Sequence, residues 1–216
     1  MENIHHITQS LFDYITGEII PRYDNFDAGH RRDHATTVID ASMSLAACYD
    51  VSRDMVFAIA AFHDTGLCRG RALHHIHSAE IVRSDKRLRE WFTPAEIETI
   101  AEAVCDHRAS NTGEPRSIYG KIVAEADRII IPDTILRRTI QYGLSNYPTL
   151  SPAEQIARAE AHIIEKYGEN GYLRLWIPES PNAARMAELR ALIADTPRLR
   201  ECLNHILAEE TARQNQ

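Results

Sequence analysis

Apolar residues recur at every third or fourth position through most of the chain, which is the spacing of one face of an α-helix. The alternation that would predict a β-strand is confined to residues 172–178, a stretch too isolated for a sheet. The pattern therefore predicts an all-α protein. The apolar positions that define its main helices are Ile7, Leu11, Ile15 and Ile19; Val38, Ile39 and Met43; Met55, Val56 and Ile59; Ile97, Ile100 and Val104; Ile122, Val123 and Ile130; Ile135, Leu136 and Ile140; Leu189 and Leu192; and Leu199 and Leu203.

Capping and breaking residues indicate where these helices begin and end. Ser52 is placed as the N-cap of the helix that leads to His63. Ser151 is placed as the N-cap of a later helix, with proline at its first position and a glutamate that completes a capping box. Pro21 is expected to stop the first helix. Gly66 is expected to close the helix before it, because glycine accepts the left-handed backbone conformation common at helix ends.

Length and charge narrow the class of protein. With 216 residues and no linker-like stretch, the chain is expected to form a single domain over residues 1–216. Its formal charge of −7 argues against general nucleic-acid binding. No apolar run approaches the ~20 residues needed to cross a bilayer, and the amino terminus lacks the pattern of a secretory signal. We therefore expect a cytoplasmic protein that binds no membrane. The sequence does not indicate its oligomeric state.

The four cysteines are scattered along the chain without the paired spacing of a zinc ribbon or a thioredoxin motif. They are expected to be reduced residues in or near the core.

A histidine and an aspartate stand side by side at the end of one predicted helix, at His63 and Asp64. Taken alone, such a pair is more simply explained as a capping histidine and an aspartate that starts a turn. Neighbours on a helix point about 100° apart. The pair could therefore grip an ion only from its edge, and further ligands would have to come from other segments.

Candidate ligands are present in other predicted helices. Asp127 lies in a strongly apolar helix, where a carboxylate is costly unless it is paired or coordinated. Arg128 is a poor partner for it, because adjacent helical residues do not face each other. His30 and His34 are four residues apart and are expected to share a helical face, but Arg31 occupies the position where a zincin motif needs glutamate. Asp127 is therefore the best independent indication of a bound ion.

These residues follow the order of a known motif. The chain resembles the HD-domain metal-dependent phosphohydrolase superfamily, whose defining series is a histidine, an adjacent histidine and aspartate, and a distant aspartate. In this sequence the series is His34, His63-Asp64 and Asp127. The resemblance covers about residues 23–131 and implies a helical bundle with its metal-binding core in that range. Residues of about 132–216 would then form C-terminal packing helices.

The resemblance also implies additional residues in the site. In relatives with an expanded metal site, two more histidines contribute to a second metal or to a phosphate pocket, and His74 and His107 match them. His30 matches a histidine often found just before the first ligand, and either lines the pocket or serves as a cap or support. The complete set of implied metal ligands is His34, His63, Asp64, His74, His107 and Asp127.

Basic residues are candidates for contacts with an anionic substrate. Arg108 either meets phosphate oxygens through its forked guanidinium or is a surface arginine favoured at a helix C-terminus. Arg116 and Lys121 are candidate substrate or leaving-group contacts, with ordinary solvation as the alternative. Asp64 is expected to orient the attacking water, and a histidine or Lys121 to protonate the leaving group.

The first functional hypothesis is a metal-dependent phosphohydrolase that cleaves a phosphate ester of a small metabolite or nucleotide. Nitrogen and oxygen ligands without thiolates suit one or two ions of Mn, Fe, Co, Ni or Zn, with Mg less favoured, and we prefer two ions. The choice between phosphomonoesterase and phosphodiesterase stays open. Two alternatives are a nucleotide-binding sensor without turnover and a di-iron oxygenase on the same scaffold.

Overall fold

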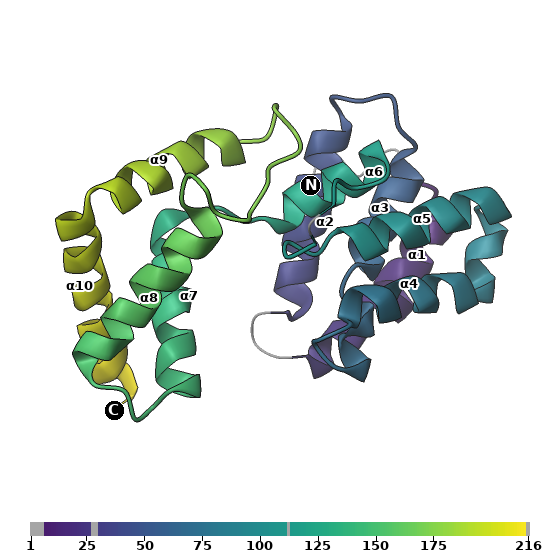
Figure 1. Ribbon diagram of the computed structural model, residues 1–216. Helices are drawn as coiled ribbons and strands as arrows, with labels where there is room; N and C mark the ends of the chain where they lie inside the picture. The colour runs from purple at the N-terminus through teal and green to yellow at the C-terminus, as the bar shows by residue number, and fades with distance from the viewer. Residues whose placement is uncertain (1–6, 27–29, 112, 215–216) are drawn as a thin grey trace. The chain divides into compact units, whose positions relative to one another are not determined.

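A computed structural model describes residues 7–26, 30–111 and 113–214, and every regular element in these residues is helical (Figure 1). The all-α prediction is confirmed. The ten α-helices of the described residues are α1 Gln9–Tyr14, α2 Arg32–Ala46, α3 Arg53–Phe62, α4 His74–Ser84, α5 Pro94–Asp106, α6 Ile118–Asp127, α7 Pro132–Asn146, α8 Pro152–Tyr167, α9 Asn182–Ala194 and α10 Thr196–Gln214.

The chain divides into two compact units. Unit 1 comprises Met1–Arg128 together with Trp176–Ser180, and unit 2 comprises Ile129–Leu175 together with Pro181–Gln216. The first boundary falls close to residue 131, where the sequence analysis placed the end of the metal-binding core. That the whole chain acts as one domain stays a prediction.

Helix α3 is the centre of unit 1. Every residue from 55 to 62 is buried, including the large side chains of Phe57, Ile59 and Phe62. Helices α2, α5 and α6 pack against it, and Ile177 from the returning segment joins the same core. Burying each large apolar side chain contributes about 1.5–3 kcal/mol. The carboxyl end of α3 is therefore held firmly, and the His63-Asp64 pair directly follows it.

The predicted N-caps are present. The Ser52 hydroxyl accepts a hydrogen bond from the Met55 amide at 3.4 Å. At the start of α8, Ser151 and Glu154 form the expected capping box. Local sequence therefore sets where these helices begin.

The prediction that Pro21 stops the first helix is wrong. Helix α1 continues as a π-helical turn over Ile15–Ile19 and then as a 3₁₀ helix over Ile20–Asn25. Pro21 lies in the first turn of the 3₁₀ helix, a position that proline tolerates. The chain changes helix type at the proline without leaving helical conformation.

Gly66 is required for a reason other than the one predicted. Its backbone is not left-handed; among the described residues only Gly70 has a positive φ, of 105°. A Cβ on Gly66 would lie 2.1 Å from the His74 carbonyl oxygen and 2.4 Å from the Ser78 nitrogen. Its amide donates to the Ser78 hydroxyl at 2.8 Å. The turn after α3 is thus in direct backbone contact with α4.

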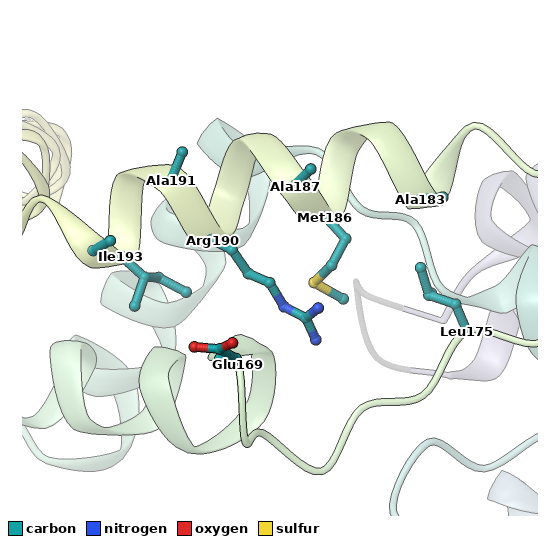
Figure 2. A pocket seen from close by; sticks show the side chains of 9 residues that line it. Glu169, Leu175, Ala183, Met186, Ala187, Arg190, Ala191 and Ile193 are labelled. Carbon is teal, nitrogen blue, oxygen red and sulfur yellow. The ribbon is translucent and has the colours of Figure 1, made fainter.

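Unit 2 has its own core, formed by α7, α8 and α10 around Ile140, Ile163 and Leu203. Beside α9 is a hollow of about 720 Å³, into which Met186 and Arg190 project (Figure 2). The Arg190 Nε donates to the Tyr167 carbonyl at 3.1 Å, so this arginine ties α9 to the end of α8. Small alanine side chains of α9 form much of the remaining wall.

The cysteines are all free, but Cys48 and Cys68 are exposed, so the expectation that they lie in or near the core is wrong for these two. Nowhere in the described part of the chain is there a helix with both the length and the apolar character to traverse a bilayer.

Replacing Gly66 by alanine should destabilise the protein by about 3 kcal/mol or more, because the new methyl group would collide with backbone atoms that cannot rotate away. Gly17→Ala is the matched control, since a Cβ there meets nothing within 4 Å, and its effect should stay within about 1 kcal/mol. Urea denaturation of both variants measures the difference. Equal midpoints would show that the close approach is not needed.

Candidate metal centre

Six polar side chains of unit 1 converge because they lie at the ends of its helices. His34 is in the first turn of α2, and His74 is the first residue of α4. His63 and His107 are the C-cap residues of α3 and α5, and Asp127 is the last residue of α6. Asp64 follows His63. The structure therefore brings together all six residues that the sequence analysis proposed as metal ligands.

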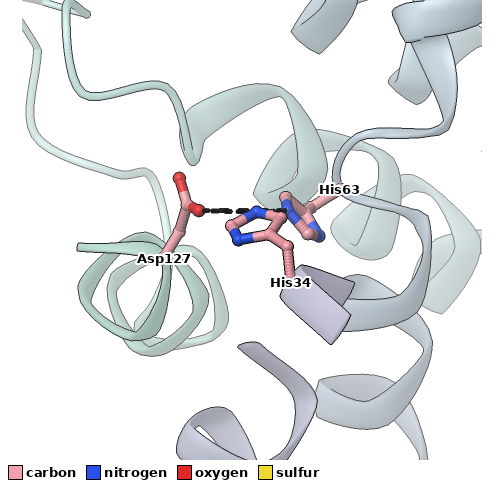
Figure 3. Close-up of side chains that lie close together, drawn as sticks. All are labelled: His34, His63 and Asp127. Carbon is pink, nitrogen blue, oxygen red and sulfur yellow. Dashed lines mark hydrogen bonds and ion pairs between the residues drawn. The ribbon is translucent and has the colours of Figure 1, made fainter. Parts of the chain in front are cut away.

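The first group consists of His34, His63 and Asp127 (Figure 3). The two Nε2 atoms of its histidines are 3.2 Å apart. Asp127 Oδ1 lies 3.3 Å from the His34 Nε2 and 3.9 Å from the His63 Nε2. Three potential ligand atoms from three helices thus surround one point.

The second group consists of Asp64, His74 and His107. Its two histidines also face each other through Nε2 atoms 3.2 Å apart. Asp64 Oδ1 lies 3.3 Å from the His74 Nε2 and 3.4 Å from the His107 Nε2. This group repeats the arrangement of the first.

Asp64 is a member of the second group, but its side chain also faces the first. Its Oδ2 lies 3.5 Å from the His34 Nε2 and 3.3 Å from the His63 Nε2, while its Oδ1 faces the second group. The side chain is only 4% exposed, so solvent does not compete for these oxygens. Asp64 is therefore positioned to bridge two cations.

In three of the four histidines, the hydrogen bond of Nδ1 fixes the direction in which the Nε2 lone pair points. The Nδ1 atoms of His63, His74 and His107 donate to the backbone carbonyls of Ala60, Arg71 and Val104 at 2.7, 2.8 and 2.6 Å. A carbonyl can only accept, so each Nδ1 carries hydrogen and a neutral ring leaves its Nε2 as a bare lone pair.

In the second group, two such lone pairs face each other at 3.2 Å. That arrangement is unfavourable unless a proton or a metal ion lies between them. Ligand atoms about 2.0–2.1 Å from one ion are about 2.9–3.4 Å from each other, which matches most of the separations in both groups. A backbone acceptor behind the ligating ring is also the usual support of a metal-bound histidine. The residues present therefore fit a divalent metal.

The electrostatics favour a cation at the same place. Burial alone would raise the pKa of the Asp64 carboxyl, but the charge of His63 and hydrogen bonds from the surrounding imidazoles hold it well below its usual range. Burial also opposes ionisation of Asp127. Its hydrogen bond with His34 and the charges of nearby imidazoles nevertheless keep the pKa of its carboxyl low. Burial also opposes protonation of His34, yet its hydrogen bonds with these two carboxylates raise its pKa to about 9. Both carboxylates are thus ionised at neutral pH and attract positive charge.

Tyr23 holds the turn that carries His63 and Asp64. Its fully buried hydroxyl donates to the Ala61 carbonyl at 2.9 Å and accepts from the Asp64 amide at 3.2 Å. The sequence analysis missed this residue. It lies in the 3₁₀ helix Ile20–Asn25, and nothing in the local sequence indicates a partner so distant in the chain.

The structure also locates the other predicted site residues. The His30 ring centroid is 5.6 Å from that of His34, so His30 lies beside the first group. It precedes α2, which begins at Arg32, so the prediction that His30 and His34 share a helical face is wrong. Arg108 lies beside the second group, where its Nη1 donates to the Ala72 carbonyl and approaches His75.

Arg116 and Lys121 form ion pairs with acidic residues that are not among the six clustered residues. Arg116 forms a forked pair with Asp106 and a further contact with Glu102. Lys121 pairs with Glu114 at 2.5 Å. A substrate contact for either residue would require breaking these bonds.

The fold and the site together define an all-α protein with a cluster of histidine and aspartate side chains at helix ends that fits a divalent metal. The family model of the HD domain matches residues 31–130, which include all six clustered residues. The chain therefore contains an HD domain over these residues. No curated protein and no solved structure gives a significant match to the chain.

His74→Ala should lower the metal content from about two ions per chain to about one, because it removes a ligand of the second group only. Elemental analysis after metal loading and desalting measures the ratio. His205→Ala is the control, since His205 is an exposed residue of α10. An unchanged ratio in His74→Ala would exclude a second ion at this group.

Tyr23→Phe should weaken metal binding about tenfold, because the Asp64 amide and the Ala61 carbonyl lose the group that fixes the turn. Tyr119→Phe is the matched control: its hydroxyl accepts from the Ser52 amide at the opposite end of α3. That variant should lose stability without losing metal affinity. Calorimetric metal titration of both proteins tests the difference, and equal affinities would contradict the role of Tyr23.

Proposed function

We propose that this protein is a metal-dependent phosphohydrolase that cleaves a phosphate ester of a small metabolite or nucleotide. The observation that carries the proposal is the pairing of two three-residue groups, in which Asp64 of the second group also faces the histidines of the first. Two neighbouring cation sites with a common carboxylate suit phosphoryl transfer, in which negative charge on the phosphoryl oxygens must be stabilised.

The ligand set restricts the metal. Four imidazoles and two carboxylates without a thiolate suit Mn, Fe, Co, Ni or Zn, and make Mg less favourable. Such an ion supplies Lewis acidity toward phosphoryl oxygens and lowers the pKa of water. His34, His63 and Asp127 would hold one ion, and His74 and His107 the other, with Asp64 common to both.

The chain's own residues would bind and orient the substrate. Asp64, being ionised and placed between the groups, is suited to accept a proton from or orient an attacking water. His30 lies at the edge of the first group and Arg108 at the edge of the second. Lys121 is bound to Glu114, which disfavours it as the proton donor to the leaving group. The cytoplasmic location and the lack of nucleic-acid partners stay predictions.

Asp64→Ala and Asp127→Ala should each lose metal retention and lower turnover by at least about a hundredfold, because each removes an ionised ligand. Phosphate release from a panel of nucleotides and sugar phosphates measures turnover. Asp40→Ala, an exposed carboxylate of α2, is the control. Full activity in either site variant would exclude the proposed centre.

The same assay separates the alternative functions. Metal binding without phosphate release on any panel member would favour a sensor. Iron content with oxygen consumption would favour a di-iron oxygenase.

A further inference from the structure

Arg108 is held by two uncharged groups. Its Nη1 donates to the Ala72 carbonyl at 2.5 Å and lies 3.4 Å from the His75 Nδ1. A guanidinium has only donors, so the His75 Nδ1 is the acceptor in this contact and its ring is neutral. Both groups that hold Arg108 are therefore uncharged, and its positive charge is not cancelled by them.

Three other arginines of the domain are already neutralised or inaccessible. Arg83 forms a forked pair with Glu98, and Arg116 forms one with Asp106. Arg128 is buried against the ring of Trp176, and its Nε and Nη1 are out of reach of solvent. Arg108 alone among these four combines partial exposure with uncharged partners.

The remaining donors of Arg108 form the edge that suits an oxyanion. Within the part of the chain that the structure describes, its Nε and Nη2 have no bonding partner. These two nitrogens make the forked edge of the guanidinium, which binds two oxygens of one phosphate or carboxylate. Because Nη1 is already anchored, little side-chain freedom is lost when the fork binds.

The position of the fork relates it to the second group of the metal centre. Arg108 directly follows His107 in the chain, and its partners Ala72 and His75 lie on either side of His74. The His75 ring packs edge-to-face on the His74 ring at 5.6 Å between centroids. The anchor and the proposed ligands are thus parts of one packed cluster.

We propose that Arg108 forms a phosphate-oxygen subsite beside the second group, and that His75 is a positioning residue that holds its guanidinium in place. The proposal rests on the phosphohydrolase function above. It assigns the substrate an anionic oxygen pair on the side of Asp64 that faces His74 and His107. It also gives a reason for the buried His75, which is not among the six clustered residues.

The test measures binding of inorganic phosphate to the Mn-loaded protein by calorimetry, with metal content determined for every sample. Arg108→Gln should weaken phosphate binding about tenfold or more, because it removes the charged fork. His75→Leu should weaken it about threefold to tenfold at unchanged metal content, because the fork is no longer held. His75→Asn places an oxygen acceptor close to the position of Nδ1 and should restore most of the affinity.

Arg83→Gln is the control, since it removes an arginine whose charge Glu98 already cancels. Wild-type protein that loads metal but binds no phosphate, or an Arg108→Gln variant that binds it unchanged, would overturn the subsite. Unchanged affinity in a folded His75→Leu variant, or no recovery in His75→Asn after a loss in His75→Leu, would overturn the positioning role. If His75→Leu does not fold, Arg108→Gln decides the subsite and the affinity of His75→Asn decides the positioning role. Wild-type protein that loads no metal would overturn the proposed function, and the subsite with it.

Discussion

The structure of unit 1 depends on one buried carboxylate, that of Asp64. It is almost completely removed from water, yet four imidazoles approach its two oxygens within 3.5 Å. A buried charge is tolerated only when it is matched by opposite charge and by hydrogen bonds. The surrounding helices place these imidazoles by ending where they do, and a proton or a cation at the Nε2 atoms then supplies the opposite charge.

Close packing of backbone is what makes this convergence possible. Gly66 allows the turn after α3 to touch the first turn of α4, which brings His74 within reach of Asp64. Tyr23 then fixes the same turn from the other side. The geometry of the centre therefore depends on residues that bind no ion, and small changes in them are transmitted directly to the ligands.

Much of the fold and the candidate ligands could be predicted from the sequence, because helical periodicity and the order of His34, His63-Asp64 and Asp127 are local properties of the chain. What could not be predicted depends on distant contacts. Sequence alone does not show that Arg116 forms an ion pair with Asp106, or that the hydroxyl of Tyr23 accepts a hydrogen bond from the Asp64 amide. The prediction for Gly66 is wrong because the local rule describes an isolated helix end, whereas contact with α4 decides this position.

The segment Trp176–Ser180 sets a limit on how the HD domain can be separated from the rest of the chain. Ile177 is part of the core of unit 1, and the Trp176 amide donates to the fully buried Glu125 at 2.7 Å, two residues before Asp127. A fragment cut at residue 128 would retain every clustered histidine and aspartate but would lose this amide and this side chain. The boundaries of a working minimal domain are thus not contiguous in sequence, and an excised version would need the five-residue segment grafted back.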